Sequence, residues 1–121
     1  MKSRSLFLGI LLATLLSSEL CAEELIFREK QIKLHHLAGT VVDPAGFPIE
    51  YATVELRDPK DNHVIASTFA DAQGRFSFAD HKRGEHLAIR ASNRGFNIVQ
   101  YNVVIRELGK SKLRVILTVA T

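Results

Sequence analysis

The stretch Thr40–Asp58, TVVDPAGFPIEYATVELRD, contains a loop rich in turn-forming residues and then a run in which apolar and polar residues alternate strictly. In that run Ala52, Val54 and Leu56 are apolar, and the residues between them are polar or charged. Side chains alternate between the two faces of a β-strand, so the run predicts a strand with one buried and one solvated face. The fold is therefore expected to be built from half-buried strands.

Six further runs share this β-type pattern, and Gly, Pro, Asp and Asn separate them. They cover residues 39–42, 64–70, 75–78, 86–92, 98–105 and 112–120. None combines the length of a helix with apolar residues at i, i+3 and i+4. Seven short strands in about 100 residues predict an all-β, seven-stranded sandwich.

The first 22 residues are predicted to be a signal peptide. Lys2 and Arg4 give a positive start, and Leu6–Leu16 is a short apolar run. That run is shorter than the roughly 20 apolar residues that span a bilayer, and Ala22 is a small residue suited to cleavage. We therefore expect a secreted or periplasmic protein with no transmembrane segment in its mature chain.

Cys21, the one cysteine of the chain, raises the alternative of a lipoprotein signal. Such signals resemble sequences with small residues before an acylated cysteine, whereas Glu19 and Leu20 stand there in this chain. Lipid anchoring through Cys21 is therefore the less favoured interpretation. Cleavage after Ala22 leaves a mature chain without cysteine, which must be held by its core and not by disulfides.

Residues 23–36, EELIFREKQIKLHH, are ambiguous. The spacing of Ile32 and Leu34 suits an edge strand, whereas EELIFREK favours a short helix. We favour a partly ordered N-terminal arm, because chain ends are often mobile. The predicted organisation is a signal peptide over 1–22, an arm over 23–36 and a β-sandwich domain over 37–121.

Two D-x-x-G sequences, Asp43–Gly46 and Asp71–Gly74, are either turns or ligand sites. In a type I turn the aspartate accepts a hydrogen bond from the N–H two residues later, and a following glycine tolerates positive φ. Calcium requires six to eight oxygen ligands, and each loop offers one carboxylate. Asp43, Gly46, Asp71 and Gly74 are therefore predicted to be structural turn residues and not metal ligands.

Little in the sequence points to catalysis, a metal or nucleic acid. Nucleophilic catalysis needs a Ser, Thr or Cys beside a positioned base, and a metal needs three or four converging ligands. The histidines lie beside predicted turns or chain ends without such spacing: His35, His36, His63, His81 and His86. The formal charge of +3 comes from interspersed bases and acids, not from a basic stripe. We expect no enzymatic activity, no metal, no cofactor and no nucleic-acid partner.

Three ordered blocks resemble the carboxypeptidase regulatory-like domain family. They are GTVVDPAGFPIEYATVEL from Gly39, TFADAQGRFSF from Thr68 and GEHLAIRASNRGF from Gly84. The resemblance covers residues 37–119. It implies a transthyretin-like, Greek-key β-sandwich that is non-catalytic and serves in structural support, protein contact or carbohydrate binding.

The expected partner is a separate protein or a glycan. Protein contact is the first hypothesis, because the weakly charged run 112–120 would accept a partner strand if it lay at a sheet edge. The alternative is a carbohydrate-binding module, since sugar sites use exposed aromatic rings. The candidate rings are Phe47, Tyr51 and Tyr101.

Overall fold

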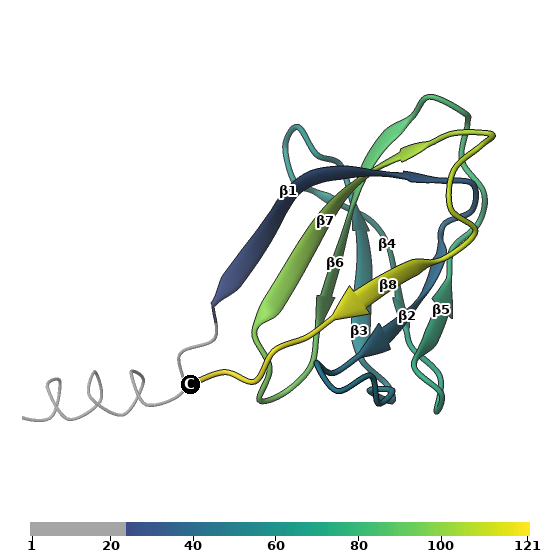
Figure 1. Ribbon diagram of the computed structural model, residues 1–121. Coiled ribbons are helices and arrows are strands. Elements are labelled where there is room, and N and C mark those ends of the chain that lie inside the picture. Colours follow the sequence, from purple (N-terminus) through teal and green to yellow (C-terminus); the bar gives the residue numbers. More distant parts are fainter. Residues whose placement is uncertain (1–23) are drawn as a thin grey trace, which may run out of the picture.

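The computed structural model describes residues 24–121, and in this range the chain forms two facing β-sheets and no helix (Figure 1). In chain order the strands are β1 (Leu25–Leu34), β2 (Ala38–Val42), β3 (Thr53–Arg57), β4 (Val64–Phe69), β5 (Arg75–Ser77), β6 (His86–Ser92), β7 (Ile98–Ile105) and β8 (Leu113–Ile116). The predicted all-β sandwich is confirmed, and each of the seven predicted strands is present. Residues 24–121 therefore contain no helical segment that could span a bilayer. The predicted signal peptide, with Cys21, lies outside the described residues.

The large sheet has the strand order β1-β7-β6-β3-β4, and the small sheet has the order β5-β2-β8. Within the large sheet β7, β6, β3 and β4 pair antiparallel, and β1 pairs parallel with β7. In the small sheet β2 pairs antiparallel with β5 and parallel with β8. The outermost strands are thus β1 and β4 in one sheet, and β5 and β8 in the other.

The expectation of a partly ordered arm over residues 23–36 is wrong. Leu25–Leu34 form β1, a strand in addition to the seven that were predicted. Its pairing with β7 runs from Leu25 to Leu34, with one irregularity after Arg28. Leu34 is fully buried, and Ile32 packs against the core. This pairing and burial outweigh the helical tendency of the first residues, because tertiary contacts override weak local propensity.

The core lies between the sheets and consists of the inward-facing residues of the alternating runs. In β3 the prediction is met residue by residue, since Val54 and Leu56 are fully buried while Glu55 between them is partly exposed. The largest fully buried side chains are Leu34, Leu37, Leu56, Ile89, Leu117, Val41, Val54, Val99, Val103, Val104 and Val115.

Candidate functional site

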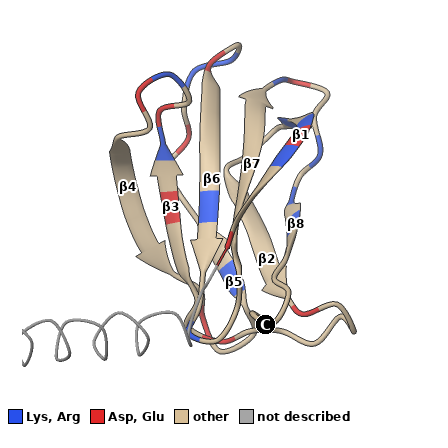
Figure 2. Ribbon diagram, turned by 90° about the vertical axis from the view of Figure 1, so that its left-hand side faces the viewer, with Lys and Arg blue, Asp and Glu red and all other residues tan. Residues whose placement is uncertain are grey.

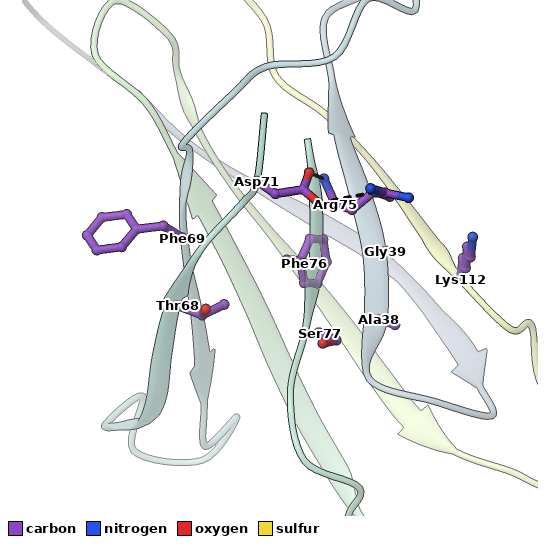
Figure 3. A pocket seen from close by; sticks show the side chains of 9 residues that line it. All are labelled: Ala38, Gly39, Thr68, Phe69, Asp71, Arg75, Phe76, Ser77 and Lys112. Carbon is purple, nitrogen blue, oxygen red and sulfur yellow. Dashed lines mark hydrogen bonds and ion pairs between the residues drawn. The ribbon is translucent and has the colours of Figure 1, made fainter. Parts of the chain in front are cut away.

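One side of the sandwich is open, where β4 ends the large sheet and β5 ends the small one. Figure 2 shows β4 at the margin of its sheet, with no strand beyond it. A cavity of about 350 Å³ lies on this side. We call it the β4–β5 cavity, and the residues that line it are Ala38, Gly39, Thr68, Phe69, Asp71, Arg75, Phe76, Ser77 and Lys112 (Figure 3).

The outer backbone edge of β4 is unpaired. Ala70 donates its N–H to the carbonyl of Ala52 at 2.8 Å, and two residues back Thr68 lies opposite Val54 of β3. In an antiparallel pair, alternate residues direct both backbone groups to the same neighbour. The backbone N–H and C=O of the residue between them, Phe69, and of Ser67 therefore point away from β3. No described strand lies on that side.

The side chains of β4 are uncharged, and several are exposed. From His63 to Ala70 there is no Lys, Arg, Asp, Glu or Pro, and β4 is uniformly tan in Figure 2. Val64, Ile65 and Phe69 are 45%, 40% and 68% exposed. Proteins usually protect such edges with charges, prolines or bulges. Here the only such feature is a register shift near Ile65, which leaves the rest of β4 regular and open.

The β4–β5 cavity carries charged groups at its mouth. The Asp71 carboxylate accepts the N–H groups of Gln73 and Arg75, both at 2.9 Å, and Nε of Arg75 at 3.2 Å. Figure 3 shows this pair above Phe76, with Lys112 on the far side of the small sheet's β2. Lys112 makes no ion pair with any residue between 24 and 121. The cavity therefore has one neutralised charge pair and one free ammonium group.

The hydrogen bonds to Asp71 lower the pKa of its carboxyl, chiefly through the backbone N–H of Arg75. The unfolded chain titrates near the ordinary value of 3.8. A lowered folded pKa therefore gives stability that is complete above that value and is lost as pH falls through the folded pKa. Asp71→Asn keeps an acceptor oxygen but removes the charge. We expect its urea midpoint to lie below that of the wild type near neutral pH, and the gap to narrow as pH falls below the ordinary value of 3.8. A gap that stays constant with pH would contradict this assignment.

The first D-x-x-G sequence also forms a turn. Oδ1 of Asp43 accepts the N–H groups of Ala45 and Phe47 at 3.0 and 2.9 Å. Gly46 has φ of 92°, and Gly74 in the second turn has φ of 76°. These are left-handed conformations that favour glycine. In both turns Oδ1 of the aspartate thus accepts two backbone N–H groups of the turn itself.

The three candidate sugar-binding rings do not form one surface. Phe47 and Tyr51 are exposed, at 68% and 61%. The prediction for Tyr101 is wrong, because this ring is only 7% exposed and packs in the core, where its hydroxyl accepts the N–H of Ile116 at 3.3 Å. The signal was present in the sequence, since Tyr101 alternates in phase with the buried Val99 and Val103. The ring supports β8 and is not presented to solvent.

The last strand, β8, lies at an edge of the small sheet. Strand addition through the run 112–120 requires such an edge position. Its free edge is nevertheless short. The N–H of Ile116 is occupied by the Tyr101 hydroxyl, and the strand ends there. Beyond it, the backbone of residues 118–120 pairs with that of residues 95–97. The longer and freer edge is β4, which the sequence did not single out.

A second feature that the sequence reasoning missed is a group of acids and a histidine in the loop before β4. Ligand-type atoms of Asp58, Asp61 and His63 lie within 4.8 Å of one another. Asp58 accepts the N–H of Lys60, and Asp61 accepts the N–H of His63, which lowers the pKa of Asp61. Arg57 also bonds a carbonyl of this loop at 2.7 Å. The hydrogen bonds of these side chains stabilise the loop that leads into β4.

The pattern of one protein family matches most of the chain: the carboxypeptidase regulatory-like domain, over residues 36–118. The match includes β2 to β8 and both D-x-x-G turns, and it begins after β1. No curated protein sequence matches the chain.

Proposed function

Because this chain belongs to the carboxypeptidase regulatory-like domain family, whose members are non-catalytic regulatory modules, we propose that it is an exported accessory module that binds another protein. The contact forms at the open side of the sandwich, through the free edge of β4. The observation that carries the proposal is an uncharged edge strand with outward-facing backbone groups at Ser67 and Phe69.

A partner binds by adding a strand to β4. In strand addition, main-chain hydrogen bonds provide affinity and pockets for alternate side chains provide specificity. Thr68 shares the inward face of β4 and lines the β4–β5 cavity. The inward side chains of an added strand therefore meet this cavity, while its outward side chains meet Phe69, whose ring points to the opposite side of β4 from Thr68 in Figure 3.

The expected free energy of binding favours β4 over β8 as the edge to which a partner strand is added. Each main-chain hydrogen bond contributes about 0.5–1.5 kcal/mol net, and either edge supplies some of these. Full burial of a phenylalanine side chain contributes a further 1.5–3 kcal/mol or so. Phe69 is 68% exposed beside the β4 edge, so covering it yields a large part of that amount. On β8, by contrast, Leu113 and Val115 are already buried in the core.

The proposed location is the periplasm or the extracellular space. It is supported by the positive start, the short apolar run and Ala22 in the first 22 residues. The mass of the protein recovered from the periplasmic fraction distinguishes cleavage after Ala22 from acylation at Cys21.

Site-specific photo-crosslinking in cells tests the contact. A photoreactive amino acid at Phe69 should give a discrete covalent adduct in the periplasmic or secreted fraction. The matched control is Leu108, which is 97% exposed on the loop between β7 and β8. An adduct from position 69 and none from position 108 supports the proposal. The same adducts from both positions, or none from position 69, would refute it.

A further inference from the structure

The free edge of β4 has a sequence that is nearly symmetric about Ser67. Residues 65–69, IASTF, run from a large apolar residue through a small one to Ser67, and then through a small residue to a large apolar one. An antiparallel copy of the same strand therefore sets large side chains against large and small against small. Resting on the proposed function, we infer that the strand added to β4 is β4 of a second copy of this chain. The two-fold axis passes through Ser67.

The backbone N–H and C=O groups of β4 point in the directions that such an axis requires. A residue on the axis must direct its N–H and C=O to the free side, so that it can exchange both hydrogen bonds with its own copy. Ala70 donates its N–H to Ala52, so by alternation Thr68 and Ala66 direct their backbone groups to β3 and Ser67 between them directs its own outward. Ser67 then pairs with Ser67 of the second copy. A one-residue shift of the axis would place backbone groups already bonded to β3 at the interface.

The side chains on the outer face complement one another across this axis. Ile65, Ser67 and Phe69 are the exposed residues of the stretch, and Ala66 and Thr68 are half-buried. In the pairing, the side chain of Phe69 of each copy lies near that of Ile65 of the other, so the contact occurs twice. Ile65 lies at the register shift of β4, so this is a side-chain contact that requires no regular backbone pairing at Ile65. Aromatic and β-branched residues are favourable cross-strand partners. Both side chains are at least 40% exposed in the single chain, so the pairing removes apolar surface from water.

Charge explains why β4, and not the other edge of the large sheet, pairs with itself. A two-fold axis brings each side chain near the same side chains of the other copy, and like charges directly opposite are destabilising. β1 carries Arg28, Lys30 and Lys33 against a single acid, Glu29. β4 carries no charge. Self-pairing is thus electrostatically allowed at β4 and opposed at β1.

The expected dimer is weak and depends on concentration. Stable interfaces bury about 1,200–2,000 Å² in total, and one short pair of strands covers less than that. Sedimentation equilibrium of the mature chain, from about 5 μM to 1 mM, should therefore show the mass rising from one chain toward two. Over the same range, the amide hydrogens of Ser67 and Phe69 should gain protection from exchange.

A charge exchange at the axis tests the geometry. Ser67→Lys sets two ammonium groups opposite each other and Ser67→Asp sets two carboxylates, so each variant alone should associate at least ten-fold more weakly than the wild type. An equimolar mixture of the two should recover the dimer, because opposite charges then meet. The matched control is Leu108→Lys on the exposed loop between β7 and β8, which adds the same charge outside the β4 edge and should dimerise like the wild type. Circular dichroism confirms that each variant is folded.

A wild type that stays monomeric at the highest concentration overturns the inference. So does a dimer that is indifferent to Ser67→Lys, or a mixture that fails to recover association. If the chain is monomeric but Ser67→Lys removes a crosslink from Phe69 to a different protein, self-pairing fails and the proposed function stands. If position 69 gives no adduct and the wild type is monomeric, both fail.

Discussion

Replacing Phe76 with alanine should lower the free energy of unfolding by about 3–5 kcal/mol, the usual cost of truncating a buried phenylalanine. Phe76 is the inward residue of the three-residue strand β5 and is only 5% exposed. Its ring lies edge-on to Phe78, with centroids 6.2 Å apart, and close over the backbone of Gly39. Among the described strands β5 pairs with β2 alone, and Phe76 is its one buried residue, so we expect this side chain to contribute strongly to the attachment of β5.

Urea denaturation followed by circular dichroism measures this loss. Ser77→Ala is the matched control, since Ser77 is the next residue on β5 and faces solvent; it should change stability by less than about 0.5 kcal/mol. A loss below about 1 kcal/mol for Phe76→Ala would mean that the ring is not part of the core. Phe76 also lines the β4–β5 cavity, so the variant is expected to loosen the binding side of the sandwich as well.

The features that the sequence predicted well are those set by local pattern. Alternation identified β3 and its buried Val54 and Leu56 because the two faces of a strand have different surroundings wherever it lies. Each turn aspartate bonds backbone groups within four residues of itself, so Asp43 and Asp71 depend on nothing distant. Such features are encoded in a few consecutive residues, and they can be recognised without knowing the topology.

The features that the sequence missed depend on which strands become neighbours. β1 is held by a parallel pairing with β7, more than 70 residues away in the chain, and no local sequence pattern predicts this pairing. The edge position of β4 is likewise a property of strand order, since the charge-free run from His63 to Ala70 would be equally suitable for the centre of a sheet. The lack of charge becomes a binding signal only when the neighbouring strand is known to be absent.

Gly74→Ala is the second substitution with a large expected effect, and we expect it to cost about 2–5 kcal/mol. Gly74 has φ of 76°, a conformation that costs an L-residue about 1–2 kcal/mol. A Cβ at this position would also lie 2.5 Å from the carbonyl oxygen of Val41. That carbonyl accepts the N–H of Ile49, and Val41 itself donates to the carbonyl of Gly74 at 2.7 Å. The buried β2 backbone therefore cannot move aside, and overpacking of this kind adds about 1–3 kcal/mol.

Gly46→Ala is the control that separates the two causes, because Gly46 occupies the same position of the other D-x-x-G turn. Its φ of 92° imposes a similar conformational cost, but the nearest atom to an added Cβ is the mobile guanidinium end of Arg114, at 3.3 Å. Gly46→Ala should therefore lose only about 1–2 kcal/mol, which is the conformational part alone. Equal urea midpoints for the two variants would show that contact with β2 contributes nothing. A larger loss at Gly74 would show that the second turn is held against the small sheet, and with it Asp71 and Arg75, which line the β4–β5 cavity.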